Sequence, residues 1–340
     1  MANAWKAVDL FSGCGGLTTG LERAGFDVVS AVEHDSLAAE TYRLNHPKVT
    51  LLETDIRKVT ARELLGRGLS KVHLLAGCPP CQGFSRVRRR NANRPALDER
   101  NWLIDDFHRL LQELRPFAVF LENVPGIERY HRFKSFLTAL RTLGYQVEWR
   151  TVDLKDYAVP QRRQRVVVLA GLGFKIEFPK PAKARRTVRS AIGDLSVPEG
   201  SSNPLHVAAD HSAAMLERIR AVPKDGGSRC DWPKELVLEC HQKCSGFKDV
   251  YGRMAWNEPS PTITGGCINA SKGRFVHPEQ NRAITLLEAA LLQTFPRSYR
   301  FSLRRGKYPT AEMIGNALPP EFAERVGKRI AAALEANCSG

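Results

Sequence analysis

The first 170 residues of the chain alternate short apolar runs with amphipathic stretches. The apolar runs are too short for helices and are rich in valine and leucine, which favours buried strands. Between them, apolar residues recur at helical spacing on single faces, as in 104–114 and 133–143. This alternation predicts an α/β fold, with a mostly parallel sheet covered by helices on both faces. The predicted strands are 8–11, 28–32, 72–76, 117–121 and 166–170.

The residue composition of the chain changes after Phe178. The next hundred residues or so are rich in glycine, proline, serine and scattered charge, and they contain no repeat. Regular helical spacing returns over 285–293 and in a last helix that begins at Pro319 and Pro320. We therefore expect three segments, namely an α/β domain at 1–179, a smaller and irregular domain at 180–277, and a return to the first domain at 278–340.

The charge balance is strongly basic, with 51 Lys and Arg against 36 Asp and Glu and a net charge of +15. Such an excess favours a polyanionic partner such as nucleic acid, although an ordinary basic surface would give the same composition. The chain has no apolar run of 18 residues and no signal-like N-terminus, so we expect neither a membrane span nor secretion. Eight cysteines at irregular spacings then predict free thiols in a reducing cytoplasm.

A glycine-rich turn, Asp9-Leu-Phe-Ser-Gly-Cys-Gly-Gly16, follows the first predicted strand and opens a helix. Glu33 ends the next strand, where a carboxylate can accept hydrogen bonds from ribose hydroxyls. Asp55 follows a third unit and could accept an adenine amino group. The glycines are not spaced as G-x-G-x-x-G, which disfavours a nicotinamide oxidoreductase. The turn therefore predicts an adenosyl ligand without phosphates.

The pair Cys78 and Cys81 has three interpretations. A zinc site would need further ligands, for which Cys230, Cys240, His241 and Cys244 are candidates at poor spacing. A redox pair would have to begin a helix in a thioredoxin-like unit. A single nucleophilic cysteine would need positive charge nearby to lower its pKa. Such charges follow directly, at Arg86, Arg88, Arg89 and Arg90, where they could also hold a phosphate backbone.

Two further clusters complete the third interpretation. Glu122-Asn-Val-Pro125 follows a predicted strand, and Gln161-Arg-Arg-Gln-Arg165 precedes another. Together the motifs resemble the DNA (cytosine-5) methyltransferase family, in the family's order and over nearly the whole chain. The matching segments are DLFSGCGG, GCPPCQGFS, ENV, QRRQR, 282–296 and 315–320, with 259–264 as a further similarity. The stretch of about 180 to 277 falls where that family keeps its target-recognition domain.

The resemblance implies a Rossmann-like class I methyltransferase sheet that carries a smaller, irregular target-recognition domain. It implies methyl transfer from S-adenosylmethionine to C5 of a cytosine flipped out of duplex DNA, leaving S-adenosylhomocysteine and requiring no metal. Cys81 would be the nucleophile that bonds to C6, and Cys78 would serve packing. Glu122 would hold the cytosine at N3, with Asn123 supporting the loop. The two residues that would orient the base and the catalytic loop are Arg163 and Arg165.

The resemblance also implies the binding residues. Those expected to line the cofactor pocket are Phe11, Ser12, Gly13, Gly15, Gly16, Glu33, His34, Asp55, Ile56, Pro79, Leu103, Asn316 and Ala317. Those expected on DNA are Gln82, Ser85, Arg86, Arg88, Arg89, Arg90 and Thr262. Arg229, Arg253 and Arg274 could each contact guanine, but solvated surface is the favoured interpretation. The expected protein is a monomer in the bacterial cytoplasm, held at the nucleoid by double-stranded DNA, and the sequence leaves its target site and any cognate restriction endonuclease open.

Two alternatives share most of these motifs. One is a relative that methylates tRNA, but that branch carries a late Cys-Phe-Thr signature that the chain lacks. The other is a non-catalytic DNA-binding protein that keeps the fold, and the intact motifs argue against it.

Overall fold

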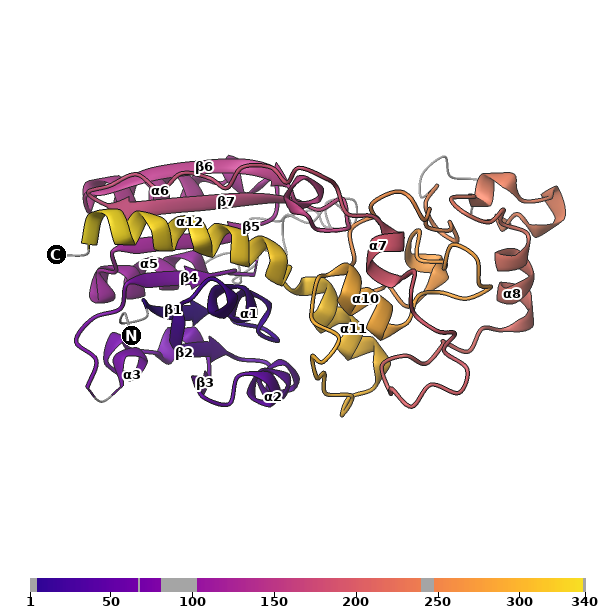
Figure 1. Ribbon diagram of the computed structural model, residues 1–340, viewed down its shortest axis with the longest axis horizontal. Coiled ribbons are helices and arrows are strands. Elements are labelled where there is room, and N and C mark those ends of the chain that lie inside the picture. The colour runs from indigo at the N-terminus through magenta and orange to yellow at the C-terminus, as the bar shows by residue number, and fades with distance from the viewer. Residues whose placement is uncertain (1–4, 67, 81–102, 240–247, 339–340) are drawn as a thin grey trace. The chain divides into compact units, whose positions relative to one another are not determined.

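The computed structural model describes residues 5–66, 68–80, 103–239 and 248–338 (Figure 1). The predicted nucleophile Cys81 and the predicted DNA contacts Gln82, Ser85, Arg86, Arg88, Arg89 and Arg90 lie outside these residues, as do Cys240, His241 and Cys244. The chain forms two compact units. The first comprises Met1–Tyr157, Gln164–Pro181 and Leu318–Gly340, and the second comprises Ala158–Arg163 and Ala182–Ala317.

The first unit is built on a seven-stranded sheet of order β3-β2-β1-β4-β5-β7-β6. The first five strands in this order are parallel, and β7 runs antiparallel to both of its neighbours. The predicted α/β fold is confirmed, and the five predicted strands correspond to β1, β2, β4, β5 and β7. The strand bounds are β1 Lys6–Leu10, β2 Asp27–Glu33, β3 Thr50–Glu53, β4 Leu74–Gly77, β5 Ala118–Asn123, β6 Tyr145–Asp153 and β7 Gln164–Leu172.

The two strands without a predicted counterpart, β3 and β6, are the edges of the sheet. An edge strand has one neighbour and buries fewer side chains, so its sequence lacks the apolar run that marks a central strand. Most side chains of β6 are exposed or half-buried, and Trp149 in its middle is 38% exposed. The sheet therefore becomes mixed at this edge, rather than staying parallel throughout.

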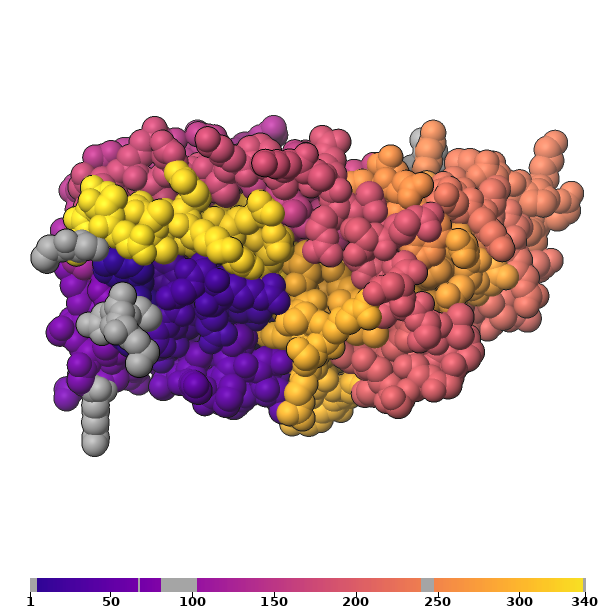
Figure 2. All heavy atoms as spheres, viewed as in Figure 1, coloured from indigo at the N-terminus to yellow at the C-terminus, as the bar shows by residue number. Residues whose placement is uncertain are grey.

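Helices cover both faces of the sheet (Figure 1). On one face α1 (Gly16–Arg23) packs against α12 (Pro320–Cys338), and Figure 2 shows α12, in yellow, beside the indigo N-terminal segment. Two glycines allow this close approach, because a Cβ atom on Gly20 would lie 2.4 Å from Ala323 Cβ and one on Gly327 would lie 2.7 Å from Ala24 Cβ. Along α12 the predicted apolar face is buried, at Phe322, Val326, Ile330 and Leu334.

The opposite face carries α5 (Leu103–Leu114) and α6 (His131–Thr142). The apolar side chains expected to share one face of each helix are buried in the main core, where Phe107 and Phe136 meet edge to face. Burying such a side chain contributes about 2 kcal/mol, so these two stripes fix the helices against the sheet. The remaining helices of this unit are α2 (Ser36–Asn45) and α3 (Ala61–Leu65).

Over the described residues the second unit is mostly loops. The α-helices described there are α7 (Val188–Ile192), α8 (Ala213–Arg220), α10 (Leu286–Leu292) and α11 (Lys307–Asn316). A small apolar core includes Ile219, Trp232 and Tyr251. Over the ranges that the structure describes, every helix of the chain is too short or too polar to span a membrane.

The segment 282–317 packs within the second unit. Arg282 pairs with the buried Glu288 at 2.7 Å, and Leu287 N donates to Leu205 O at 2.9 Å. The compact units thus divide at residues 182 and 318. The domain division predicted at residues 180 and 278 stays a prediction.

Candidate active site

The glycine turn between β1 and α1 adopts backbone conformations that few side chains tolerate. Gly13 and Gly15 have φ angles of 55° and 93°, and Phe11 has a φ of 59°. Glycine adopts such angles without steric cost, whereas a residue like Phe11 is strained there. Ser12 N donates to Val32 O at 2.9 Å, which ties the turn to the end of β2. The turn therefore brings main chain, rather than side chains, to the carboxyl edge of the sheet.

Glu33 shapes this turn as well as ending β2. Its carboxylate accepts from Gly13 N at 2.8 Å on one oxygen and from His34 N and Asp35 N at 2.8 and 2.7 Å on the other. Burial raises the pKa of Glu33, while these three N–H groups oppose the rise. The predicted cofactor residues Gly13, Glu33 and His34 are therefore brought together, with the carboxylate already oriented.

Asp55 is engaged by a neighbouring cation. Its carboxylate caps a short 3-10 helix, Ile56–Lys58, and accepts from Arg57 Nε at 3.0 Å on each oxygen. Hydrogen bonding to Arg57 lowers the pKa of Asp55 to about 2. The Arg57 side chain is 61% exposed, so it can turn into solvent at little cost. An adenine amino group at Asp55 would take the place of this guanidinium.

A buried network beneath the turn has no counterpart in the sequence motifs. Thr18 Oγ1 donates to Asp9 Oδ2 at 2.7 Å and lies 2.8 Å from Tyr42 Oη. Asp9 Oδ1 has no hydrogen-bond partner among the described residues. Burial raises the pKa of Asp9 to about 7. The first strand therefore ends in a carboxyl group that keeps its proton at mildly acidic pH.

The carboxyl end of β5 carries the predicted catalytic carboxylate. Glu122 Oε1 lies 2.6 Å from Arg165 Nε, and both side chains are largely buried. Arg165 reaches Glu122 because β7 runs antiparallel to β5, which brings the start of β7 beside the end of β5. Asn123 Nδ2 donates to Pro79 O at 3.0 Å. The structure thus brings together Glu122, Asn123, Arg165 and Pro79, which the sequence placed in three separate motifs.

Cys78 joins this cluster. Gly77 lies opposite Leu121 in the parallel register, so the next residue of β4's extension is level with Glu122. The Cys78 thiol is hydrogen-bonded to the Glu122 carboxylate. Burial first, and then the Glu122 charge, raise the pKa of Cys78 well above its ordinary value, so it stays a protonated thiol. The packing role expected for Cys78 omits this polar contact, which no local pattern indicates.

Arg163 belongs to the second unit and is only 2% exposed. Its guanidinium donates to the carbonyl oxygens of Ile263 at 3.0 Å, Gly315 at 3.0 Å and Ala317 at 3.1 Å. Because these donors are directed at main chain, any effect of Arg163 on a base passes through the segments it holds. Those segments include the predicted cofactor residues Asn316 and Ala317, at the end of α11.

Two buried glutamines bind the segments that Arg163 also holds, and the sequence analysis gave them no role. Gln161 Nε2 donates to Gln293 Oε1 at 2.5 Å, and Gln293 Nε2 donates to Ile314 O at 2.6 Å. Ile263 N donates to Gln161 Oε1 at 3.1 Å. Nearby, the predicted DNA contact Thr262 uses its hydroxyl on Arg162 O at 2.6 Å. Residues 161–163 of the QRRQR segment therefore connect loops of the second unit, whereas Gln164 and Arg165 begin β7 of the first.

The arginines considered as guanine contacts are structural. Arg253 is 1% exposed and donates to four carbonyl oxygens and to Asn281 Oδ1. Arg274 Nη1 donates to the carbonyl oxygens of Gly226, Gly227 and Arg253. Arg229 is also buried. Both the guanine contact and the solvated surface considered for Arg253 are therefore wrong, because its five N–H groups are used inside the unit.

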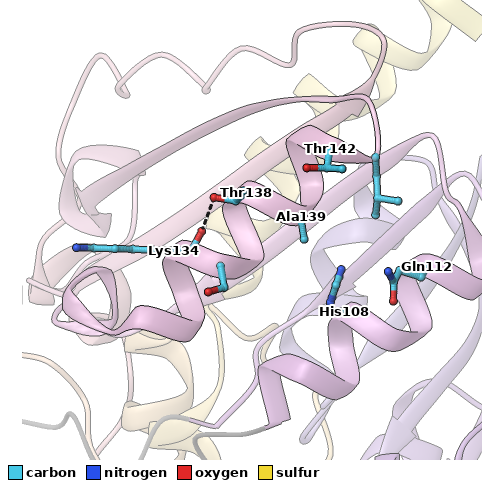
Figure 3. Close-up of a pocket in the computed structure, with 8 residues that line it drawn as sticks. His108, Gln112, Lys134, Thr138, Ala139 and Thr142 are labelled. Carbon is cyan, nitrogen blue, oxygen red and sulfur yellow. Dashed lines mark hydrogen bonds between the residues drawn. The ribbon is translucent and has the colours of Figure 1, made fainter.

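A shallow pocket lies between α5 and α6 of the first unit (Figure 3). Figure 3 shows His108 and Gln112 on α5 facing Thr138, Ala139 and Thr142 on α6. None of the residues that line it is a predicted site residue. The pocket lies along the middle of the helices, away from the carboxyl ends of the strands, where ligands bind in open α/β sheets.

Comparisons with known proteins show which family the chain belongs to. The family model for C-5 cytosine-specific DNA methylase matches residues 5–332. The Type II methylase M.HgiDII of Herpetosiphon aurantiacus is 40% identical, over 96% of this chain and 95% of that protein. The Type II methyltransferase M1.HphI of Haemophilus parahaemolyticus is 33% identical, over 95% of this chain and 86% of its own.

Solved structures show the same fold. An E. coli prophage protein named as a DNA modification methyltransferase superposes with a TM-score of 0.77 at 25% identity, over 98% of this chain and 100% of that one. The Entamoeba histolytica methyltransferase EhMeth has a TM-score of 0.68 at 16% identity, over 98% and 99% of the two chains, which supports the fold alone. The chain belongs to the C-5 cytosine-specific DNA methylase family and is an enzyme of the DNA (cytosine-5-)-methyltransferase class.

Proposed function

We propose that the protein methylates C5 of a cytosine flipped out of a specific duplex DNA sequence, through a transient bond between Cys81 Sγ and C6. The observation that carries this proposal is the Glu122–Arg165 pair at the end of β5, joined through Asn123 to the segment that leads into Cys81. A carboxyl group and a guanidinium held 2.6 Å apart can serve two neighbouring edges of one pyrimidine ring.

The chemistry requires these groups because C5 of cytosine is a poor nucleophile. Attack of the Cys81 thiolate on C6 pushes electrons through the ring, and a proton held by Glu122 at N3 neutralises the charge that develops there. Arg165, at the O2 edge, stabilises the same charge. Once C5 carries the methyl group, loss of its proton to a base and release of Cys81 from C6 restore the aromatic ring. The base must leave the duplex first, at a cost of a few kcal/mol.

S-adenosylmethionine supplies the methyl group when bound, and the first unit suits it. The turn at Gly13 presents main chain to a ligand, and an added Cβ there would meet nothing within 4 Å. Glu33 and Asp55 end neighbouring parallel strands and offer carboxylates to ribose hydroxyls and to an adenine amino group. We infer that Phe11, Ser12, Gly15, Gly16, His34, Ile56, Pro79, Leu103, Asn316 and Ala317 complete the pocket.

The same comparisons support a proposal for the substrate and the setting. The matching family model is a DNA methylase, which favours duplex DNA over tRNA. The Type II names of its bacterial relatives favour a cognate restriction endonuclease as partner and action at the bacterial nucleoid. We propose that the enzyme acts as a monomer and that Arg86, Arg88, Arg89 and Arg90 contact phosphates.

The test supplies methyl-labelled cofactor with duplex DNA or with tRNA. Label is expected in DNA, and bisulfite sequencing of DNA from expressing cells should show one methylated sequence context. A duplex with 5-fluorocytosine at that position should trap a covalent adduct with the wild type and none with Cys81→Ser. Label in tRNA alone would overturn the substrate, and methylation by Cys81→Ser at the wild-type rate would overturn the mechanism.

A further inference from the structure

Glu122 has a polar neighbour on each side at the end of β5. On the β7 side, Arg165 Nε lies 2.6 Å from Glu122 Oε1. On the β4 side, the parallel register that pairs Gly77 with Leu121 places Cys78 level with Glu122. A protonated thiol is a donor and a carboxylate accepts, so the contact between them runs from Cys78 S–H to Glu122.

We propose that Cys78 is a positioning residue for Glu122, whose S–H group donates a hydrogen bond that, together with Arg165, fixes the carboxyl group where the cytosine base binds. This inference rests on the proposed function, because it deepens the role given there to Glu122. A glutamate side chain has several rotatable bonds, and contacts from two opposite sides select one arrangement of them.

The thiol itself is held firmly. Cys78 N donates to Leu10 O at 3.3 Å, which ties the residue to β1. The next residue is tied to β5, since Pro79 O accepts from Asn123 Nδ2 at 3.0 Å. With the main chain fixed on both sides, the sulfur can move only by rotation about one side-chain bond. The sheet therefore fixes the position of the Cys78 sulfur, and the sulfur can in turn fix the position of the Glu122 carboxyl group.

The charged and titratable groups that face this pair come from three strands. They are Asp9 on β1, Cys78 after β4 and Arg165 on β7. Asp9 and Arg165 are unchanged in the variants below, so their influence cancels in the comparison.

The test compares Cys78→Val, which keeps the volume and removes the donor, with Cys78→Ser, which keeps a donor. In single-turnover methylation of the duplex identified above, Cys78→Val should lower the rate by roughly tenfold. Cys78→Ser should keep a rate close to that of the wild type, because it retains a donor. Cys267→Val, which removes a buried thiol of the second unit, is the control for loss of a cysteine as such. If Cys78→Val and Cys78→Ser lower the rate to the same extent, or if neither lowers it, Cys78 serves packing only.

A second readout does not depend on activity. The infrared S–H stretching band of Cys78 can be assigned by subtracting the spectrum of Cys78→Ser from that of the wild type. Glu122→Ala should move this band to higher frequency, because the S–H bond then loses its acceptor. A band that stays in place overturns the positioning role whether or not the enzyme methylates DNA. A band that moves in a protein without methylation activity refutes the proposed function alone.

Discussion

The two units satisfy their buried polar groups in different ways. In the first, the sheet pairs the main chain, and the polar side chains at its edge contact one another, as in the Glu122–Arg165 pair. In the second, loops without a ladder are held by side chains that donate to carbonyl oxygens, chiefly Arg163 and Arg253. An arginine thus pairs with a carboxylate in one unit and donates to the main chain of loops in the other. The fold should tolerate loss of the first kind and not of the second.

Loss of Arg253 should have the largest effect. Arg253→Met removes the donor to Val222 O, His277 O and Asn281 Oδ1, whereas Ile219 O and Gln280 O keep main-chain donors. Each unsatisfied buried acceptor costs about 1 kcal/mol or more, so the second unit should lose roughly 4 kcal/mol of stability. Hydrogen exchange measured by mass spectrometry should show faster exchange across the second unit only.

Arg274→Met is the matched control for Arg253. Its guanidinium also donates to carbonyl oxygens, but its side chain is 21% exposed and water can replace some of these bonds. We expect a loss of about 1–2 kcal/mol. Equal losses in the two variants would show that burial does not decide the cost of losing an arginine that donates to carbonyl oxygens.

Glu122→Gln tests the other side of the contrast. This substitution removes the ionisable acid and keeps the size of the side chain beside Cys78. The strand that positions the side chain is unchanged. The rate of methyl transfer should fall by about 10² to 10⁴-fold, while the melting temperature changes little. Single-turnover kinetics and a thermal melt on the same sample measure both. A large loss of stability with a small loss of rate would assign Glu122 to the scaffold.

Asp9→Asn should produce a smaller effect that depends on pH. Burial raises the pKa of Asp9 to about 7 in the folded protein, whereas the ordinary pKa of an aspartate in an unfolded chain is 3.8. The free energy of unfolding should therefore fall as pH rises through this window, by at most about 4 kcal/mol. Because asparagine does not ionise, the free energy of unfolding of the variant does not fall for this reason. Denaturant melts should show similar stabilities at pH 4 and a more stable variant at pH 8, and a variant that is less stable at pH 8 would contradict the raised pKa.

Burial explains which parts of the structure the sequence could predict. A central strand such as 117–121 or a helix face such as 104–114 must be apolar, so its pattern is visible in the residues themselves. The edge strand β6 was not predicted because it buries few side chains. The burial of Arg253 was not predicted because a charged residue in a loop has the same local pattern whether solvent or carbonyl oxygens surround it. The contact between Cys78 and Glu122 joins residues 44 apart, which only the strand order brings together.

The smallest expected effect is the coupling between two glutamines of the second unit. Gln161 and Gln293 are both fully buried, and each single substitution to Met breaks the hydrogen bond between Gln161 Nε2 and Gln293 Oε1. Each should cost about 1–3 kcal/mol, whereas the double variant should cost less than the sum, because it removes both ends of the shared bond. A double-mutant cycle from denaturant melts measures this coupling. Gln293→Met alone should also weaken cofactor binding, since Gln293 Nε2 reaches Ala317 O at 3.2 Å. Strict additivity would mean that the two side chains hold the Gly315–Ala317 segment independently, and the second unit would then be stabilised by separate contacts rather than by a connected network.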